Sequence, residues 1–319
     1  MRILFVKTSS LGDVVHNCPA VSDAARSVRG AIIDWVVEEA FAGIAALHRS
    51  VRRVIPVAVR RWRTSLFSAA TWRELRGFRA ALSAERYDCV IDTQGLLKSA
   101  LIAALAEGPA HGYDRASARE PAAARFYAHR HAVDTRLHAV ERNRRLAAAA
   151  LGYAAGGAGD PGIDYGLAAG GEPAFAARAP YAMLFTMTSR ADKLWPEARW
   201  RALGAALAAR GLQCVLPWGS EEERARAERI AQAVEGSVVP PRLPLAELAR
   251  LAARARCAVG VDTGLTHVAA ALGVPTLGLY AGSDPALTGL HAGARARNLG
   301  AAGRAPELAE VLGALENLA

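Results

Sequence analysis

The feature that most constrains the fold is a rhythm of short apolar runs that alternate with longer Ala-, Leu- and Arg-rich segments of helical period. Each run is apolar at nearly every position, which is typical of strands in a parallel sheet that is covered on both faces. Such alternation indicates βαβ units, in which a helix follows each strand. The sequence therefore predicts an α/β protein built on parallel sheets.

The rhythm occurs twice along the 319 residues, and a chain of this length has room for two domains. In the first half we predict strands at residues 3–7, 32–37, 53–57 and 87–92, and a helix over 139–151. In the second half we predict strands at 181–185, 212–216, 257–261 and 276–280, and helices over 200–210, 221–234 and 245–254. A Gly-dense segment at 152–161 opens a linker region that extends to about residue 179. The expected domains are residues 1–168 and 169–319.

The last segment, residues 306–318, carries Leu308, Val311, Leu312 and Leu315 at helical spacing. Such spacing predicts a helix with one apolar face, and that face needs a packing partner.

Charge and composition narrow the function without deciding it. Lys and Arg number 39 against 30 Asp and Glu, so the formal net charge is +9, which favours an anionic partner. Nucleic acid, a phosphorylated substrate and an anionic membrane all fit that charge. The four cysteines have no zinc-binding spacing, and no metal site is expected. No signal-peptide pattern and no apolar run of membrane-spanning length occurs, which predicts a cytoplasmic protein.

Ligands of open parallel sheets bind at the carboxyl ends of the strands, so residues that directly follow strands are the first candidates. No Gly-x-Gly-x-x-Gly follows the first strand and no P-loop motif occurs, which disfavours those two phosphate-binding routes. Two α/β domains joined by a linker can instead form a cleft, and we expect the site there.

The loop from Lys7 to Asp13 leaves the first strand and enters a helix. Gly12 and the small residues of the loop allow a ligand to come close. Asp13 has two interpretations, an ordinary helix cap or a general base for a substrate hydroxyl, and the sequence does not separate them.

Asp262, Thr263 and Gly264 form a short turn from a strand into a helix, with His267 one turn later. Unpaired amides at a helix start attract anions, so this turn predicts phosphate or nucleotide binding. Capping by Asp262 is the alternative. The strand at 181–185 leads to Thr188, Ser189 and Lys193, where Lys193 is either a cation for a leaving phosphate or a solvated surface residue.

Arginines are dense in the first half. Because guanidinium groups match phosphate geometry, Arg60, Arg61 and Arg63, just past a strand, are interpreted as part of a site for an anionic ligand. For the arginines between Arg130 and Arg145 a solvated face is favoured.

Several segments, in order, resemble the lipopolysaccharide heptosyltransferases, a family of GT-B glycosyltransferases. They include Val6-Lys-Thr-Ser-Ser-Leu-Gly-Asp13, Arg53-Val-Ile-Pro-Val57, Asp92-Thr-Gln-Gly-Leu-Leu-Lys98, Leu216-Pro-Trp-Gly219 and Val261-Asp-Thr-Gly-Leu-Thr-His267. The match spans nearly the whole chain, and its first-half segments are similar to those of the members that act on the Kdo end of the acceptor.

The resemblance implies a GT-B fold of two Rossmann-like domains facing a cleft. In such folds the first domain holds the acceptor and the second the nucleotide sugar, and the final helix commonly returns to the first domain. The implied reaction transfers L-glycero-D-manno-heptose from ADP-heptose to Kdo of Kdo-lipid A with inversion, in inner-core lipopolysaccharide synthesis. It implies no cofactor, no metal requirement, no specific nucleic-acid partner, and action at the cytoplasmic face of the inner membrane.

The resemblance also suggests roles for the candidates. Asp13 is the expected base and Lys193 the expected cation for departing ADP, because inversion by single displacement needs a base opposite the leaving group. Residues expected at the donor are Thr188, Ser189, Glu221, Asp262, Thr263, Gly264 and His267. One glutamate of the run Glu221, Glu222 and Glu223 is expected to contact the ribose of the nucleotide, and the sequence does not decide which of the three it is. Residues expected at the acceptor are Lys7, Ser10, Arg60, Arg61, Arg63, Arg119 and His138.

Two other functions remain in view. A heptosyltransferase that adds heptose to heptose shares the donor chemistry, and a basic nucleic-acid-binding protein fits the charge alone, although no recognition motif for nucleic acid occurs.

Overall fold

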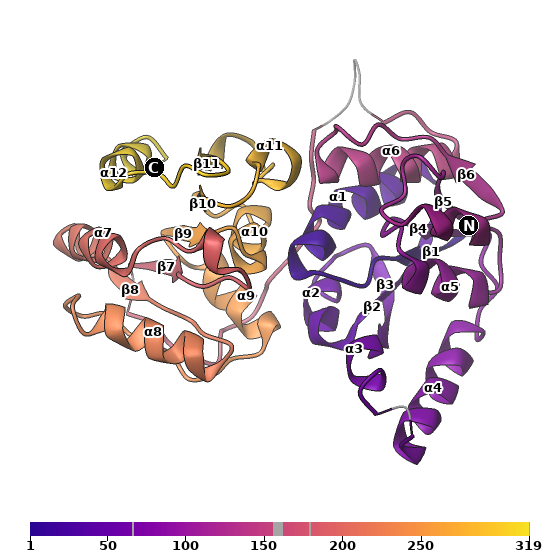
Figure 1. Cartoon of the computed structure of the whole chain (residues 1–319), viewed down its shortest axis with the longest axis horizontal. Helices are drawn as coiled ribbons and strands as arrows, with labels where there is room; N and C mark the ends of the chain where they lie inside the picture. Colours follow the sequence, from indigo (N-terminus) through magenta and orange to yellow (C-terminus); the bar gives the residue numbers. More distant parts are fainter. Residues whose placement is uncertain (66, 156–161, 179, 319) are drawn as a thin grey trace. The chain divides into compact units, whose positions relative to one another are not determined.

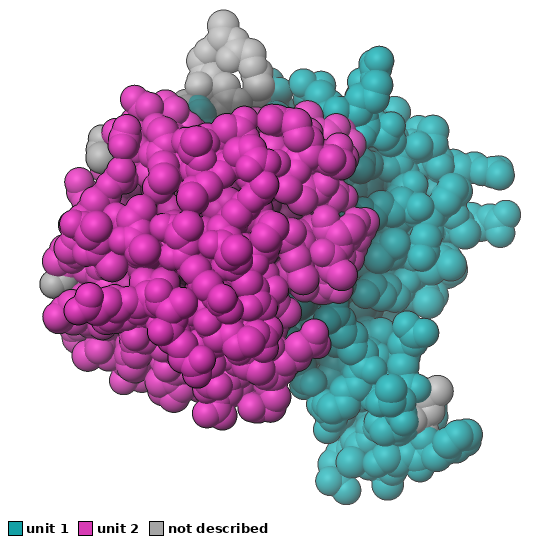
Figure 2. Space-filling view, turned by 60° about the vertical axis from the view of Figure 1, so that its left-hand side comes forward, with its two compact units in different colours: residues 1–167 teal, residues 168–319 magenta. Residues whose placement is uncertain are grey.

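A computed structural model describes residues 1–65, 67–155, 162–178 and 180–318 (Figure 1). Most of the Gly-dense segment predicted at 152–161 lies outside the described residues. The chain divides into two compact units, Met1–Leu167 and Ala168–Ala319, coloured separately in Figure 2. Both contain a parallel sheet, which confirms the α/β class.

The sheet of the first unit has the strand order β3-β2-β1-β4-β5-β6, with every pair parallel. Its strands are β1 Arg2–Val6, β2 Ile32–Glu38, β3 Val51–Val57, β4 Cys89–Asp92, β5 Ala110–Tyr113 and β6 His129–His131. The order reverses direction between β1 and β4, and open parallel sheets commonly bind ligands at the carboxyl ends of strands beside such a reversal. This is the position of the Lys7–Asp13 loop.

Helices of the first unit cover both faces of its sheet (Figure 1). They are α1 Leu11–Ser27, η1 Glu39–Phe41, α2 Ala42–Ala45, α3 Val59–Trp62, α4 Ala69–Leu82, α5 Leu97–Leu105, η2 Pro121–Phe126 and α6 Ala139–Leu151. Helix α1 packs against α6. A buried ion pair joins them, with Arg144 Nε 2.7 Å from Asp23 Oδ2. The solvated interpretation of Arg144 is therefore wrong, because this pair supplies the compensation that a buried guanidinium needs.

The second unit has the strand order β11-β10-β9-β7-β8, again all parallel. Its strands are β7 Tyr181–Phe185, β8 Gln213–Val215, β9 Cys257–Val261, β10 Thr276–Tyr280 and β11 Ala296–Gly300. Its helices are η3 Ala191–Lys193, α7 Glu197–Ala209, α8 Glu221–Ala231, α9 Leu245–Ala253, α10 Gly264–Ala271, α11 Pro285–Thr288, η4 Gly293–Arg295 and α12 Leu308–Glu316. Here the order reverses between β7 and β9. Across the described part of the chain, no helix is long and apolar enough to cross a membrane.

The final helix α12 packs on the core of its own unit. Val311, Ala314 and Leu315 share a buried cluster with Trp195 and Trp200. The indole nitrogen of Trp195 also donates to the Pro306 carbonyl at 2.8 Å, just before α12. The apolar face predicted for residues 306–318 thus has its packing partner in the second unit, which corrects the expectation that this helix packs on the first domain.

Three strands were not predicted: β5, β6 and β11. They contain His111, His129, Arg130 and Arg297, and β6 and β11 lie at sheet edges. An edge strand pairs on one side only and tolerates polar residues, so β6 and β11 carry little of the apolar pattern that reveals a central strand. β5 lies between β4 and β6, but it has only four residues, and His111 and Gly112 interrupt the apolar pattern.

Candidate active site

A buried glutamine fixes the loop that follows β1. Gln94, in the loop after β4, accepts hydrogen bonds at Oε1 from the amides of Thr8 (3.0 Å) and Ser9 (3.2 Å). Its Nε2 donates to the Ser9 carbonyl at 2.5 Å. The side chain of Asp92 in turn accepts a hydrogen bond from the backbone amide of Gln94 at 2.8 Å. Burial raises the pKa of Asp92. The backbone that leads to Asp13 is therefore held across the switch point of the sheet.

Asp13 lies at the third position of α1, where its carboxylate makes both a capping contact and an ion pair. Its Oδ2 accepts from the Ser10 amide at 2.9 Å, as a helix-capping carboxylate does. Its Oδ1 also receives Arg119 Nη2 at 3.0 Å. Burial alone would raise the pKa of Asp13, but the positive charges of Lys7 and Arg119 outweigh it and lower that pKa to about 2. The carboxylate is thus ionised at neutral pH.

Lys7 is a buried cation beside this carboxylate. Its Nζ donates to the Thr93 carbonyl at 2.8 Å and lies 3.4 Å from Asn143 Oδ1. Burial lowers the pKa of Lys7 to about 8, against the opposing effect of the Asp13 charge. Lys7 is therefore placed to set the electrostatics around Asp13, although its own side chain is buried.

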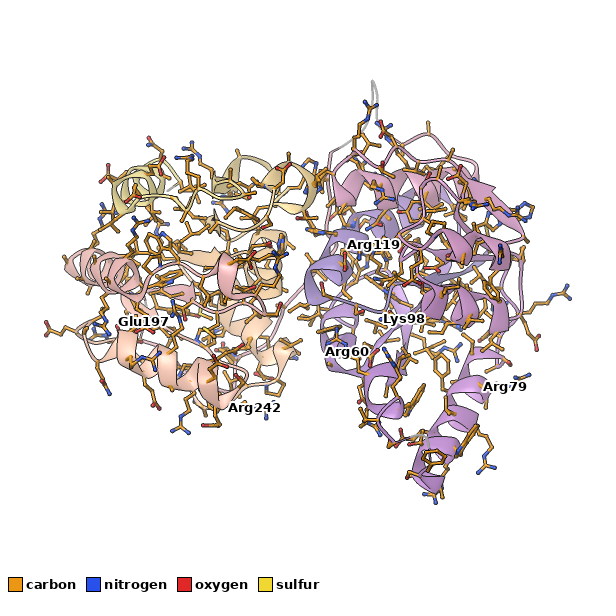
Figure 3. The ribbon with its side chains drawn as sticks, viewed as in Figure 1. Arg60, Arg79, Lys98, Arg119, Glu197 and Arg242 are labelled. Atoms are coloured by element: carbon orange, nitrogen blue, oxygen red, sulfur yellow. The ribbon has the colours of Figure 1, made fainter. Side chains whose placement is uncertain are left out.

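Further cationic and aromatic side chains of the first unit contact the Lys7–Asp13 loop, α1 or one another. Lys98, on α5, donates from Nζ to Ser9 Oγ at 3.1 Å, and Arg142 lies over the Tyr113 ring, 4.9 Å from its centroid. His138 caps α6 and packs edge-on against the His16 ring, 5.4 Å between centroids. Figure 3 labels Arg119, Lys98 and Arg60 in this unit. The first unit therefore offers an ionised carboxylate within a cationic rim, a combination suited to an anionic ligand that carries a hydroxyl.

The predicted Arg60, Arg61 and Arg63 lie on or directly after α3, and no bond joins them to Asp13 among the contacts of the described residues. Arg61 is paired with Glu39 at 3.0 Å and with Glu74 at 2.9 Å. Arg60 stacks over the Phe41 ring at 5.5 Å, and Arg63 is exposed. The guanidinium groups of Arg60 and Arg63 are the more available of the three for a ligand.

In the second unit, four side chains converge on Asp262 at the end of β9. Lys193 Nζ lies 2.6 Å and Ser283 Oγ 2.5 Å from Asp262 Oδ2, and His267 Nε2 lies 3.5 Å from Oδ1. Thr188 Oγ1 donates to the Asp262 carbonyl at 2.9 Å. Burial would raise the pKa of Asp262, but these bonds from His267, Lys193 and Ser283 lower it strongly. Capping does not explain this carboxylate, since its oxygens contact other side chains.

Topology explains why these residues meet. β10, β9 and β7 are neighbours in the sheet, so the loops that follow them lie side by side at the carboxyl edge. Those loops supply Ser283, Asp262 and Thr188. Helix α10 starts directly after β9, with Thr263 as its N-cap and Gly264 as its first residue, so its free amides open at the same edge. The arrangement presents an ammonium, hydroxyls and helix amides, which together suit a diphosphate.

Two other residues predicted at the donor, Ser189 and Glu221, do not belong to the group of side chains around Asp262. Ser189 is exposed on the loop after β7. Glu221 begins α8 and its side chain is 78% exposed, whereas Glu223 Oε2 accepts from the Gly219 amide at 2.6 Å. Glu223 is thus committed to the turn before α8, which leaves Glu221 and Glu222 as the candidates for a ribose contact.

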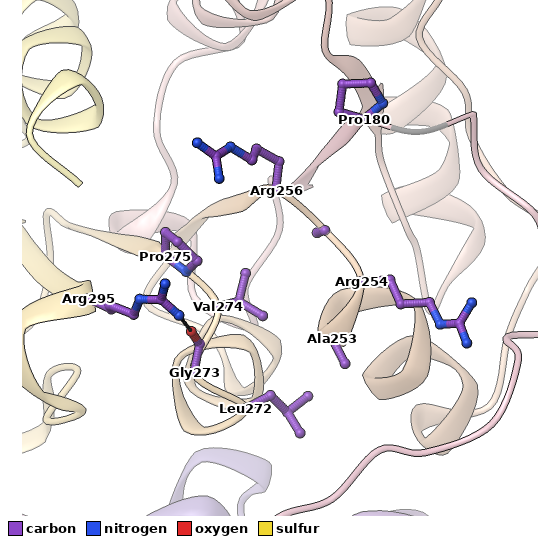
Figure 4. Close-up of a pocket in the computed structure, with 10 residues that line it drawn as sticks. Pro180, Ala253, Arg254, Arg256, Leu272, Gly273, Val274, Pro275 and Arg295 are labelled. Atoms are coloured by element: carbon purple, nitrogen blue, oxygen red, sulfur yellow. Dashed lines mark hydrogen bonds between the residues drawn. The ribbon is translucent and has the colours of Figure 1, made fainter. Parts of the chain in front are cut away.

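A cavity of about 670 Å³ in the second unit lies at the opposite edge of the sheet (Figure 4). Pro180, Arg256 and Pro275, which line it, directly precede β7, β9 and β10. These are the amino ends of the strands, whereas Asp262 follows the carboxyl end of β9. The cavity is therefore separate from the candidate site despite its arginines.

Sequence reasoning missed Gln94, Lys98, Asn143 and Ser283 as members of these clusters. Gln94 and Lys98 lie in the segment Asp92–Lys98 that carried the resemblance, and Ser283 follows a predicted strand, so the strand-end rule could have found Ser283. Asn143 carries no such signal, because it lies inside α6. Among the described residues, no group of three or more His, Cys, Asp or Glu is arranged to hold a metal ion.

Residues 75–311 match the model of glycosyltransferase family 9 (heptosyltransferase). The chain belongs to this family. It is 50% identical to lipopolysaccharide heptosyltransferase 1 of Pseudomonas aeruginosa, over 91% of this chain and 81% of that protein. It is 46% identical to the protein of the same name from Escherichia coli K12, over 91% and 90%. These matches confirm the family expected from the sequence.

Solved structures agree with the sequence comparison. The chain is similar to E. coli heptosyltransferase WaaC with ADP, at a TM-score of 0.92 and 43% identity over the full length of both chains. WaaC with ADP-2-deoxy-2-fluoro heptose gives a TM-score of 0.88 at 42% identity. The structure of E. coli ADP-heptose heptosyltransferase II, at 21% identity and a TM-score of 0.77, shares the fold. The GT-B architecture expected for the two sheets is thereby confirmed.

Proposed function

We propose that this family member transfers L-glycero-D-manno-heptose from ADP-heptose to a hydroxyl of Kdo on Kdo-lipid A, with inversion at the anomeric carbon. One observation carries the proposal. The ammonium of Lys193, the hydroxyls of Ser283 and Thr188 and the start of α10 gather at Asp262, in a chain 42–43% identical to structures that hold ADP and an ADP-heptose analogue. We assign the second unit to the nucleotide sugar and the first to the acceptor.

Asp13 is the proposed general base. Its carboxylate is ionised in the free protein and so is ready to accept the proton of the acceptor hydroxyl. A carboxylate with a pKa near 2 is a weak base, however, and Arg119 contributes to that low value. An acceptor carboxylate or phosphate that draws Arg119 away from Asp13 removes one of these charges. Asp13 then becomes more basic at the moment when the acceptor is in place.

Lys193 is the proposed cation for the leaving group. As the glycosidic bond to ADP breaks, negative charge grows on the diphosphate while the sugar acquires oxocarbenium character. A cation and amides that are already oriented stabilise that charge without reorganisation. Asp262 holds Lys193 at 2.6 Å, and we propose that it and His267 orient both the ammonium and the sugar.

The acceptor distinguishes this reaction from the transfer of heptose to heptose. Relatives at 46–50% identity are named heptosyltransferase 1, whereas the heptosyltransferase II structure is 21% identical. We further propose that Lys7, Ser10, Arg60, Arg61, Arg63, Arg119 and His138 form the acceptor side. The net charge of +9 then serves an anionic lipid acceptor at the cytoplasmic face of the inner membrane. Nucleic acid is not needed to explain it.

The test is direct. The protein is incubated with ADP-heptose and Kdo-lipid A, while ADP release and the mass of the acceptor are followed together. We expect ADP release that depends on the acceptor, and a product heavier by one heptose. A parallel sample with an acceptor that already carries the first heptose should remain unchanged. Turnover only in that second sample would replace the proposal with its heptose-to-heptose alternative.

A further inference from the structure

Helix α5 is apolar on both of its faces. Its inner face, with Ala100, Ile102 and Ala103, is buried in the first unit. On its outer face Leu97, Leu101 and Leu105 recur every four residues and therefore form one stripe along the helix. These residues are 40%, 48% and 48% exposed. A surface helix normally turns a polar face to water, so an apolar outer face indicates something that covers it.

Arginines lie beside η2, a neighbour of α5. α5 packs against η2, whose last residue, Phe126, is itself exposed. Beside η2 is an open cavity of about 790 Å³, lined by Arg115, Arg125 and Arg130 together with Asp114 and residues of η2. Asp114 accepts from the Ser117 amide at 2.8 Å and so is engaged in its own turn. Helix η2 thus contacts α5 and also contributes Arg125 to the cavity that the arginines line.

We propose that Leu97, Leu101 and Leu105, with the arginines beside η2, dock the chain on an anionic lipid surface. An apolar stripe next to guanidinium groups has the chemistry of an interfacial helix, whose leucines enter the boundary between headgroups and acyl chains while the cations contact phosphates. The proposal rests on the proposed function, because the acceptor of that reaction is a lipid. α5 also links the two regions, since Lys98 at its start contacts Ser9 in the loop that leads to Asp13.

A second copy of the chain fits this surface less well. Two-fold pairing would bring two identical groups of arginines into one interface, and like charges within an interface are repulsive. Three leucines and a phenylalanine also cover much less than the roughly 1,000 Å² that a stable interface needs. A lipid surface has the opposite charge and imposes no such area requirement.

The experiment measures binding of the full chain to vesicles by flotation. Vesicles of phosphatidylethanolamine and phosphatidylglycerol are compared with neutral vesicles of phosphatidylcholine. We expect the double variant Leu101→Gln/Leu105→Gln to bind the anionic vesicles about tenfold more weakly. The matched control is Leu287→Gln, since Leu287 is a comparably exposed leucine on α11 of the second unit, and it should bind like the parent. Arg115→Gln and Arg125→Gln should each weaken binding to the anionic vesicles alone, by about fivefold.

Activity separates failure of docking from failure of the proposed function. With a deacylated, water-soluble Kdo acceptor, the double variant should keep the parent's kcat/KM. With Kdo-lipid A in vesicles, it should lose activity in proportion to its lost binding. Unchanged vesicle binding by the double variant would overturn the docking proposal, even if the parent is an active heptosyltransferase. If the unsubstituted protein binds the vesicles but transfers no heptose to either acceptor, the proposed function is overturned and the docking proposal is not. If light scattering shows the parent to be a dimer and the double variant a monomer, the stripe is an interface between copies.

Discussion

Arg119 donates from Nη2 to Asp13 Oδ1 at 3.0 Å, so the proposed base of the first unit is held by a cation whose own side chain is 43% exposed. An exposed guanidinium exchanges partners readily, because its ion pair is screened by water. Asp13 also accepts a hydrogen bond from the backbone amide of Ser10, a contact that does not involve Arg119. The carboxylate can thus change its electrostatic surroundings without losing its place on α1.

Replacement of the carboxylate alone tests the base. Asp13→Asn keeps the shape of the side chain but cannot accept a proton, so we expect kcat to fall by about 10²- to 10⁴-fold. The affinity for ADP should not change, because the ADP site is assigned to the second unit. Initial rates of ADP release and calorimetric titration with ADP measure the two quantities. Asp134→Asn removes a carboxylate from an exposed ion pair with Arg136 and is the matched control. Residual turnover within tenfold of the parent would remove Asp13 from the role of base.

The pKa of Asp13 should respond to Lys7. Lys7 is the largest of the charges that lower this pKa, which is about 2, so Lys7→Met should raise it toward its ordinary value near 3.9. The sign for catalysis follows, because a base works only when ionised. The acidic limb of the kcat/KM profile should therefore move to higher pH, and carbon NMR of the aspartate carboxyl groups gives the pKa without activity.

The same shift has a consequence for stability. A carboxyl group whose folded-state pKa lies below its unfolded value adds stability that is present above pH about 4 and is lost as the pH falls toward 2. Lys7→Met should bring the folded-state pKa of Asp13 closer to its unfolded value, so this carboxyl group should contribute less to the free energy of unfolding at neutral pH. Lys98→Met is the control, since Lys98 contacts Ser9 and is not among the main charges that lower the pKa of Asp13. Equal NMR shifts in both variants would show a general charge effect and contradict a specific role for Lys7.

Much of the fold could be predicted because central parallel strands are apolar along their whole length. The runs that became β1, β2, β7, β9 and β10 all have this pattern, and the rule that ligands meet strand ends led directly to Asp13, Thr188 and Asp262. The contacts among candidates were harder to predict. Ser283 reaches Asp262 only because β10 lies beside β9, and strand order is not encoded in any local pattern.

Which charged side chains are buried could not be predicted from the sequence either. Nothing in the local pattern distinguishes Arg144, which is buried against Asp23, from exposed Arg145 next to it. Lys7 likewise follows an apolar strand and could equally have been solvated. Whether such a side chain is buried depends on a partner distant in sequence, here Asp23 for Arg144 and Thr93 for Lys7.

The cation of the second unit can be tested by ligand choice. Lys193→Met should weaken ADP binding by about 10- to 100-fold, the range for a charge-assisted hydrogen bond, and leave adenosine binding unchanged because adenosine has no diphosphate. Without Lys193, the Asp262 carboxylate repels the diphosphate. Adding Asp262→Asn should therefore restore part of the ADP affinity. Arg201→Gln is the control, since exposed Arg201 on α7 of the same unit pairs with Glu197. Equal losses for ADP and adenosine would indicate a damaged fold and would contradict the assignment.

The requirement for a metal is tested separately. If the Lys193 ammonium and the amides of α10 carry the charge of departing ADP, activity measured with excess EDTA should stay within about twofold of the untreated rate. Lys193→Met provides the comparison. This variant lacks the ammonium charge, so added Mg²⁺ should raise its rate of turnover by replacing part of that charge. Complete loss of the parent's activity in EDTA, with recovery on addition of Mg²⁺, would contradict a charge supplied by the protein.

Gln94 should matter for both stability and turnover, although we place it outside contact with substrate. Gln94→Leu removes three hydrogen bonds to the backbone of Thr8 and Ser9 in a buried site, which should lower the free energy of unfolding by about 2–4 kcal/mol. The loop to Asp13 loses its anchor, so kcat should also fall, while KM for ADP-heptose stays constant. Gln213→Leu is a matched control, because the Gln213 side chain also bridges backbone groups, at Arg178 and Gly236, but in a more exposed place in the second unit. It should cost less stability and leave kcat unchanged. Urea denaturation and initial rates measure both effects, and a Gln94→Leu protein that is less stable yet turns over at the parent's rate would show that Asp13 keeps its position without this anchor.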